Sequence, residues 1–219
     1  MTSNIKSVLL ALGASFVAFQ AGAQTYSNQS FLNGSGYGEL GGGRFTSFGQ
    51  TFELGETKRL DDWTFYPLAG SAGNVKLLIS RWDSQRVVGP VIYESAPIHY
   101  AGPYYGQLKF SSINTILADS SYIAFLSVSG VDSPLTDMSV QATTSSNGGL
   151  NGRFFYSSTF NPQLPDASNN VWHGDSSYAS LGFTAKFSPV SAVDEPNPFA
   201  LLMLGLSAVG YVMRKKSVG

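Results

Sequence analysis

The sequence predicts an all-β domain, a β-sandwich in a jelly-roll-like arrangement, on three grounds. Aromatic residues make up 13% of the chain and charged residues only 12%, and glycine occurs 24 times, a composition that suits short strands joined by turns. About nine segments alternate apolar and polar side chains at the spacing typical of sandwiches. Residues 113–118 are the one segment that we interpret as a helical turn. A closed barrel is the alternative architecture.

The strand patterns also predict where some strands lie. Gln50 falls on the apolar side of residues 46–54, and because a buried amide must be hydrogen-bonded, we expect it to tie two strands together. Residues 122–128 are apolar on both faces, which indicates a central strand. Gly89 and Pro90 interrupt their strand, which indicates a bulge or a sheet edge. The other expected strands are residues 60–66, 75–83, 87–95, 106–110, 139–143, 153–157 and 181–187.

The N-terminus carries the three parts of a secretory signal peptide. Lys6 supplies a positive charge, residues 8–19 form an apolar core, and Ala21 and Ala23 occupy the two positions that a signal peptidase reads. We therefore expect signal peptidase to remove this segment, so that the mature chain begins at Gln24. A buried N-terminal helix is the alternative. The chain has no cysteine, so we expect an exported domain that is stable through its core alone.

The C-terminus has a second tripartite pattern. A proline-rich stretch containing Asp194, Glu195 and Pro196 precedes the apolar residues 199–213, and a basic cluster follows. As a helix, the apolar segment would be about 22 Å long, shorter than the ~30 Å hydrocarbon core of a bilayer. The basic end should stay cytoplasmic, which places the body outside. The basic cluster consists of Arg214, Lys215 and Lys216.

This pattern resembles the PEP-CTERM sorting signal of Gram-negative bacteria, in which a Pro-Glu-Pro tripeptide precedes a short transmembrane helix and a basic tail. Glu195 and Pro196 match the tripeptide, and Asp194 stands where that family has its first proline. The resemblance implies that exosortase, a membrane protease-transpeptidase, cleaves the tail after transient anchoring in the inner membrane. The body would then be released or attached at the cell surface, in association with exopolysaccharide and biofilm. An anchor that is never cleaved is the alternative.

These patterns divide the chain into five parts and predict an exported protein that is not an enzyme. The glycine-rich residues after the signal peptide are interpreted as a flexible lead-in or a long loop. The parts are a signal peptide (1–23), the lead-in (24–43), the β-sandwich (44–188), a linker (189–198) and a C-terminal transmembrane sorting helix with its basic tail (199–219).

A lectin-like carbohydrate-binding module is the alternative function. Residues 48–129 loosely resemble a β-sandwich module of exported bacterial proteins that is often compared with carbohydrate-binding domains. Exposed aromatic rings would stack on the apolar faces of sugars. Two clusters carry candidate rings: Tyr100, Tyr104 and Tyr105 in one, and Trp172 beside His173 and Asp175 in the other.

A small secreted hydrolase is a further alternative, in which His173 and Asp175 would join a serine. The chain lacks a Gly-x-Ser-x-Gly motif, and His99 is its other histidine. No cofactor is expected, although a structural calcium ion would find oxygen ligands in loops. The net charge of −1 argues against a nucleic-acid partner. The candidate calcium ligands are Asp61, Asp62, Asp132, Asp137, Asp166 and Asp175.

Overall fold

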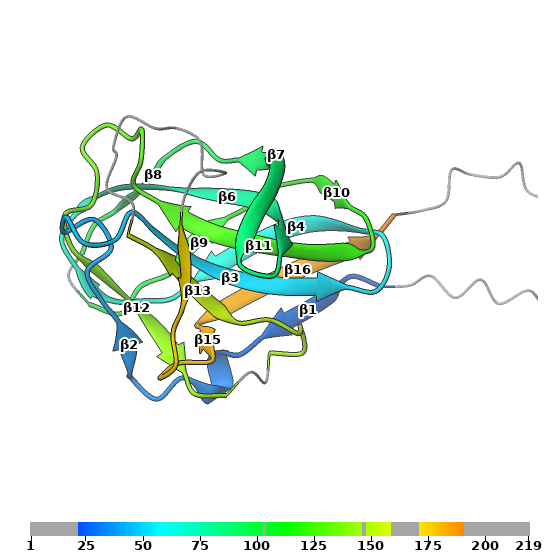
Figure 1. Cartoon of the computed structure of the whole chain (residues 1–219), viewed down its shortest axis with the longest axis horizontal. Helices are drawn as coiled ribbons and strands as arrows, with labels where there is room; N and C mark the ends of the chain where they lie inside the picture. The colour runs from blue at the N-terminus through cyan, green and yellow to red at the C-terminus, as the bar shows by residue number, and fades with distance from the viewer. Residues whose placement is uncertain (1–21, 103, 146–147, 159–170, 191–219) are drawn as a thin grey trace, which may run out of the picture.

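The computed structural model describes residues 22–102, 104–145, 148–158 and 171–190 of the chain. Within these ranges the regular structure is β, apart from one short 3-10 turn, η1 (Gln29–Phe31). Every pairing between the named strands is antiparallel. The all-β prediction is therefore confirmed, and Figure 1 shows the sheets layered against one another.

The widest sheet in the described part of the chain has seven strands and forms one wall of the core. β11 (Ser120–Ser127) lies between β3 (Ser47–Leu54) and β6 (Gly73–Asp83), which confirms the central strand that the pattern of residues 122–128 predicted. β8 (Ile98–Tyr100) pairs separately with β6. The order of the other strands is β14 (Trp172–Gly174), β13 (Phe154–Ser157), β3 (Ser47–Leu54), β11 (Ser120–Ser127), β6 (Gly73–Asp83) and β7 (Arg86–Glu94).

Two smaller sheets of the described residues contribute the other side of the core. The first contains β1 (Gln24–Ser27), β16 (Phe183–Pro189), β4 (Lys58–Phe65) and β10 (Thr115–Leu117), with β9 (Leu108–Phe110) also paired to β4. The second contains β15 (Ser180–Leu181), β12 (Met138–Thr143) and β2 (Gly36–Tyr37), with β5 (Pro67–Gly70) also paired to β12.

The core between these walls is built largely of aromatic rings. Phe52 of β3 packs against Trp63 of β4 with ring centroids 5.1 Å apart, and Trp63 stacks on Phe183 of β16 at 5.3 Å. All three side chains are buried. Burial of each such side chain contributes about 1.5–3 kcal/mol relative to exposure. This packing is the source of stability for a domain that has no cysteine to form disulfides.

The seven-stranded sheet buries its outer face as well. A second apolar cluster lies there, in which the Trp172 ring contacts the rings of Phe125 at 5.2 Å and Trp82 at 5.8 Å. Ser47 and Thr51, on the polar side of the β3 pattern, are consequently buried too. The period-two pattern of β3 is therefore correct about which side chains face the core, but on its polar side only Glu53 faces water.

Gln50 ties two sheets together, as its place in the pattern predicted. Its Oε1 accepts hydrogen bonds from the Leu181 N–H at 2.9 Å and from the Ser180 hydroxyl at 3.0 Å. Asn28 extends the network: its Nδ2 donates to the same hydroxyl and to the Leu181 carbonyl, and its Oδ1 accepts from the Phe183 N–H at 2.8 Å. We call Asn28, Gln50 and Ser180 the polar clasp, because they join the N-terminal segment, β3 and β15.

Gly182 divides the expected strand 181–187 into two. Leu181 pairs with β12, whereas Phe183 begins the pairing of β16 with β4, so the chain changes sheets at this glycine. A Cβ atom on Gly182 would lie 2.9 Å from Leu32 and 3.3 Å from the Gln141 carbonyl oxygen. The crossing is therefore open to glycine but too tight for a side chain.

The helical turn expected at residues 113–118 is wrong, because this segment contains β10. Ser112 and Asn114 have φ angles of +59° and +52°, a left-handed conformation that a right-handed helix excludes. Thr115 then pairs with Leu60 of β4. The β-branched residues of the segment favour this extended edge strand over a helical turn.

The lead-in expected at residues 24–43 also differs from the structure. β1, η1 and β2 lie in it, and β1 and β2 pair with β16 and β12. A Cβ atom on Gly36 would lie 2.9 Å from the Val140 carbonyl oxygen, and one on Gly41 would lie 2.0 Å from that of Leu135. These glycines allow two backbone segments to approach closely. The number of glycines alone had suggested a flexible segment instead.

The bulge or edge expected at Gly89 and Pro90 is confirmed. β7 is the last strand on its side of the described sheet, and its register shifts between the pairs that involve Ile79 and Arg81. Gly89 has a φ angle of +73°, which favours glycine. An irregular edge of this kind resists pairing with a second sheet.

Candidate functional site

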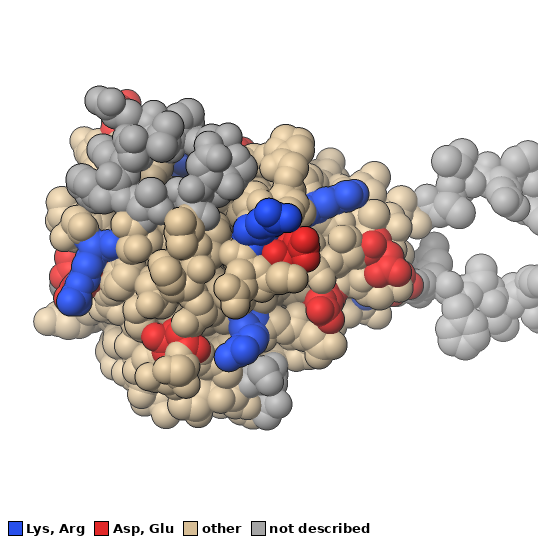
Figure 2. Space-filling model, viewed as in Figure 1, with Lys and Arg blue, Asp and Glu red and all other residues tan. Residues whose placement is uncertain are grey.

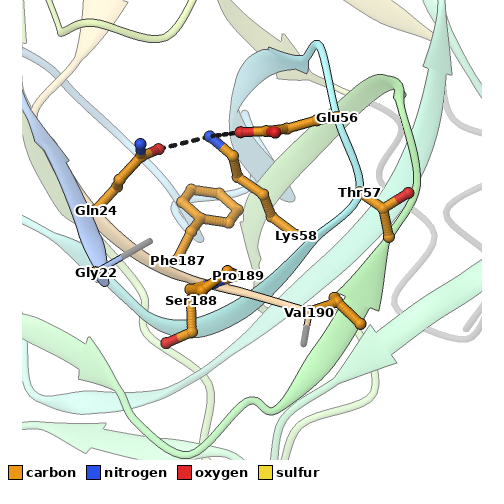
Figure 3. A pocket seen from close by; sticks show the side chains of 9 residues that line it. All are labelled: Gly22, Gln24, Glu56, Thr57, Lys58, Phe187, Ser188, Pro189 and Val190. Carbon is orange, nitrogen blue, oxygen red and sulfur yellow. Dashed lines mark hydrogen bonds and ion pairs between the residues drawn. The ribbon is translucent and has the colours of Figure 1, made fainter. Parts of the chain in front are cut away.

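The two ends of the described domain lie side by side. β1 pairs with β16 so that Gln24 lies opposite Phe187, and the start of β1 and the end of β16 are at the same end of the domain in Figure 1. We call this end the terminal pole. It holds a cavity of ≈ 130 Å³ (Figure 3), lined by Gly22, Gln24, Glu56, Thr57, Lys58, Phe187, Ser188, Pro189 and Val190.

Lys58 is the central polar group of the terminal pole. Its Nζ donates to Gln24 Oε1 at 2.6 Å and to the Tyr26 hydroxyl at 3.0 Å, and it lies 3.1 Å from Glu56 Oε1. The Tyr26 hydroxyl donates to the same Gln24 oxygen at 2.7 Å. Burial alone would lower the pKa of Lys58, but its hydrogen bonds to Tyr26 and Glu56 outweigh that effect and raise it. Two donors, one of them charged, therefore meet on one amide oxygen.

Of the predicted processing residues, the structure describes Ala23 alone. Ala23 is exposed and directly precedes β1. Ala21 and the sorting residues Asp194, Glu195, Pro196, Arg214, Lys215 and Lys216 lie outside the described residues. In the part of the chain that the structure describes, no helix has the length and apolar character needed to cross a membrane.

The predicted tyrosine cluster is divided by the fold. Tyr104 and Tyr105 are 72% and 67% exposed, whereas Tyr100 is buried and pairs with Gly73 at the start of β6. Tyr100 therefore belongs to the core, which corrects the expectation that it stacks on a sugar. Tyr105 has a φ angle of +38°, strained for a non-glycine residue, and its N–H donates to the Leu68 carbonyl at 3.1 Å.

Trp172 is also a core residue. It is only 4% exposed and belongs to the apolar cluster on the outer face of the seven-stranded sheet. This corrects its assignment as an exposed platform for a sugar. Sequence alone placed it beside polar neighbours, but the strand β14 turns alternate side chains to opposite faces, so that Trp172 is buried while His173 is exposed.

A different set of aromatic side chains forms a continuous, partly exposed surface. Tyr156 lies opposite His173 in the β13–β14 pair, with ring centroids 5.6 Å apart. Tyr37 stacks on Tyr156 at 5.3 Å, and Phe45 meets the Tyr156 ring edge-on at 4.9 Å. We call Tyr37, Phe45, Tyr156, Tyr178 and His173 the aromatic surface. Its tyrosines and Phe45 are half-buried and packed on the core, and His173 is exposed.

Hydrogen-bonding groups border the aromatic surface. Arg44 forms an ion pair with Glu39 at 2.8 Å, and both side chains are more than half exposed. Burial, reinforced by its contact with the Tyr156 hydroxyl, raises the pKa of Tyr37 well above its usual value, so Tyr37 remains a neutral donor. Sequence reasoning missed this surface because its rings come from segments far apart in the chain. No short sequence motif predicts that these rings come together.

The residues considered for hydrolysis do not converge. In a Ser/His/Asp site the carboxylate would accept a hydrogen bond from the imidazole, but Asp175 Oδ1 accepts from the N–H groups of Ser177 at 2.6 Å and Tyr178 at 2.9 Å. Asp175 therefore caps a turn. His173 contacts Tyr156 instead, and His99 Nδ1 pairs with Asn74 Oδ1 at 3.0 Å.

The candidate calcium ligands are dispersed over the domain. Asp61 and Asp62 border a cavity of ≈ 400 Å³. Asp61 accepts hydrogen bonds from Arg59 Nε at 3.0 Å and from the Ser188 hydroxyl, and Asp62 lies 3.8 Å from Lys109 Nζ. Within the described residues, no three acidic or histidine side chains gather as a metal site would require. Asp132 and Asp137 lie in loops, and Asp166 lies outside the described residues.

On the face shown in Figure 2, positive and negative side chains are interspersed over a mostly uncharged surface. Comparisons of the chain with protein-family models, with curated proteins and with solved structures find no match. The function is therefore argued from the terminal pole, the aromatic surface and the sequence patterns at the two ends.

Proposed function

We propose that the chain is an exported, non-enzymatic protein of the cell surface or extracellular matrix of a Gram-negative bacterium. In this proposal, signal peptidase removes the N-terminal segment and exosortase processes the C-terminal signal after transient anchoring in the inner membrane. The mature protein is associated with exopolysaccharide and biofilm. Its finer architecture is a jelly-roll-like sandwich flanked in the precursor by a signal helix and a transmembrane helix.

The observation that carries this proposal is the terminal pole. A folded body that presents both of its ends on one side can stay close to a membrane that apolar segments at both ends of the chain enter. The pairing of Gln24 with Phe187 brings the ends together in this way. Lys58 and Glu56 add polar contacts around the point where the N-terminal strand begins. The geometry is compatible with a body that folds while still attached at its C-terminus.

Cell fractionation combined with intact mass measurement tests the export proposal. We expect a mature protein that begins at Gln24 and lacks the apolar segment 199–213. Replacing both Glu195 and Pro196 with alanine should leave the precursor in the inner membrane, whereas replacing Asn197 with alanine serves as the matched control. A wild-type protein that keeps both ends and stays in the cytoplasm would contradict the proposal.

Carbohydrate binding is a second candidate function, favoured by the aromatic surface. Stacking on sugars needs rings that are exposed on one side and held rigidly on the other. Tyr37 and Tyr156 meet this requirement, since they are half-buried and pack on Phe48 and Phe154. Neighbouring Arg44 and Glu39 would take hydroxyl groups. The ligand class would be a neutral polysaccharide with accessible apolar sugar faces.

Retention on immobilised exopolysaccharide tests this second function. The Tyr156→Ala variant should lose retention by at least about twofold to tenfold, because stacking on an aromatic ring contributes about 0.5–1.5 kcal/mol beyond the area it buries. Tyr104→Ala is the matched control, since Tyr104 is exposed but lies outside the aromatic surface. Equal retention of the wild type and Tyr156→Ala, with an unchanged melting temperature, would rule the aromatic surface out as the binding site. Loss of retention with Tyr104→Ala alone would instead place the binding site at the exposed Tyr104 and Tyr105.

A further inference from the structure

We infer that the terminal pole promotes cyclisation of Gln24 to pyroglutamate in the mature protein. The inference rests on the proposed function, because it requires signal peptidase to expose the α-amino group of Gln24. An N-terminal glutamine carries its own electrophile, the side-chain amide, at a distance that allows a five-membered ring to close. What the structure adds is an environment that polarises this amide.

In the reaction, the neutral α-amine of Gln24 attacks its own side-chain carbon Cδ. A bond forms between the α-nitrogen and Cδ, and the bond between Cδ and Nε2 breaks. The proton lost by the amine is transferred to the departing nitrogen, which leaves as ammonia. No oxidant, reductant or second substrate is needed, so atoms and electrons balance within this one residue.

Charge develops on Gln24 Oε1 when Cδ is attacked, and two donors already converge on that atom. Lys58 Nζ lies 2.6 Å from it and the Tyr26 hydroxyl lies 2.7 Å from it, as the link between Gln24 and Lys58 in Figure 3 illustrates. Donors placed in advance at an atom that becomes negative stabilise the transition state. Lys58 keeps its position through the reaction because Glu56 and the Tyr26 hydroxyl also hold its Nζ.

The same cation favours the reactive form of the nucleophile. A free α-amino group at Gln24 would lie on the residue that Lys58 contacts, and two nearby positive charges disfavour each other. The neutral amine is the form that attacks, and cyclisation removes the charge altogether. Gln24 is exposed, so the ammonia that leaves passes directly to solvent. The product would protect the exposed end of β1 from aminopeptidases.

The experiment starts from the full-length precursor, cleaved in vitro with purified signal peptidase and followed by intact mass over time. Wild type should lose the mass of one ammonia molecule and become resistant to Edman sequencing. Lys58→Met keeps the apolar stem but removes the cation, and Tyr26→Phe keeps the ring against Phe187. Each should slow cyclisation by about tenfold, less than the ~100-fold effect of a donor in a water-excluded oxyanion hole.

Lys109→Met is the matched control, because Lys109 lies on β9 of the same sheet but contacts Asp62. It should cyclise at the wild-type rate. A chain cleaved after Ala23 that keeps a free Gln24 amine overturns the inference, and equal rates in wild type and both variants overturn the role of Lys58 and Tyr26. A precursor that is not cleaved after Ala23 contradicts the export proposal instead, so the two failures give different masses.

Discussion

Two regions of the domain bury polar side chains in opposite ways. In the polar clasp, the Asn28 amide and the Gln50 carbonyl oxygen are matched by hydrogen-bond partners on β15 and β16. On the outer face of the seven-stranded sheet, the Ser80 and Ser157 hydroxyls and the Trp172 indole N–H have no hydrogen-bond partner in the structure. Buried polar groups specify a structure when they are fully paired, and they destabilise it when they are not.

The difference assigns different tasks to the two regions. The polar clasp holds the first strand, the third strand and the last strands in one register, since a slip by one residue would leave several amide groups unpaired. The outer face is held by the rings of Trp82, Phe125 and Phe155 around Trp172. Apolar contacts of that kind tolerate unpaired hydroxyls because packing, not pairing, supplies the stabilisation.

Removal of the Asn28 amide should have the largest effect. Asn28→Ala leaves the buried Phe183 N–H without the Asn28 Oδ1 acceptor and removes one of the two donors to the Leu181 carbonyl, which can still accept from the Ser180 hydroxyl. We expect the free energy of unfolding to fall by about 3–4 kcal/mol, with about 1–3 kcal/mol from the unpaired N–H and about 0.5–1.5 kcal/mol from each of the other hydrogen bonds lost. Chemical denaturation measures it. Asn33→Ala is the control, because Asn33 caps an exposed turn at Ser35. If Asn28→Ala lost no more stability than Asn33→Ala, the polar clasp would not be held by its hydrogen bonds.

Replacement of Gln50 should have the next largest effect. Gln50→Leu preserves the approximate size of the side chain but removes the acceptor for Ser180 and Leu181. The expected loss is about 2–3 kcal/mol in the free energy of unfolding. Glu53→Leu on the same strand, at an exposed position, is the matched substitution. If Gln50→Leu were as stable as wild type, apolar packing would be sufficient in the clasp as well.

The Tyr37 hydroxyl lies between these extremes, partly buried and paired with Tyr156. Its folded-state pKa is raised by burial first and by Tyr156 second, so the folded state keeps a proton that the unfolded state loses above about pH 10. The contribution is therefore present below that pH and is lost as the pH rises. At about pH 11 the loss should be at most ~1.4 kcal/mol for this residue.

Urea denaturation at about pH 8 and about pH 11 measures the alkaline loss. Tyr37→Phe should reduce the difference between the two pH values, although burial also raises the pKa of Tyr93, Tyr100 and Tyr122. Tyr104→Phe, at an exposed position, is expected to leave the difference unchanged. An identical alkaline loss in wild type and Tyr37→Phe would show that the hydroxyl is not held by the fold.

The smallest effect is expected on the outer face. Ser157→Ala removes a buried hydroxyl that has no hydrogen-bond partner, so the domain should become more stable by up to about 1 kcal/mol. Ser180→Ala supplies the contrast, since Ser180 belongs to the polar clasp and its loss should destabilise. A Ser157→Ala variant that unfolds as readily as Ser180→Ala would mean that both hydroxyls are equally well satisfied.

Local pattern was sufficient for the parts of the fold in which one face of a strand is apolar. The alternation around Gln50 identified β3 and the inward direction of its amide, and the doubly apolar residues 122–128 identified β11. A left-handed backbone conformation is harder to predict from sequence where it falls on residues other than glycine, as it does at Ser112 and Asn114. The helical turn expected at residues 113–118 was wrong for this reason.

For the candidate sites, composition near a residue was a poor guide to exposure. Tyr100 and Trp172 stand in polar, glycine-containing stretches, yet each is buried by an element distant in sequence. Tyr37 and Tyr156 are 119 residues apart in the chain and touch only because β2 and β13 approach the same part of the core. No pattern within a short window carries that information.

By itself, the sequence determined the fold class, the order of the principal strands and the inward direction of Gln50, because each depends on a period of two residues or on the chemistry of one side chain. Only the tertiary structure decided which glycines allow close backbone approach, which aromatic rings reach the surface, and that the first and last strands of the described domain meet at the terminal pole. These properties depend on pairing between segments far apart in the chain, such as Gln24 with Phe187. The free energy of such pairing is distributed over many contacts, so no single residue predicts which segments pair.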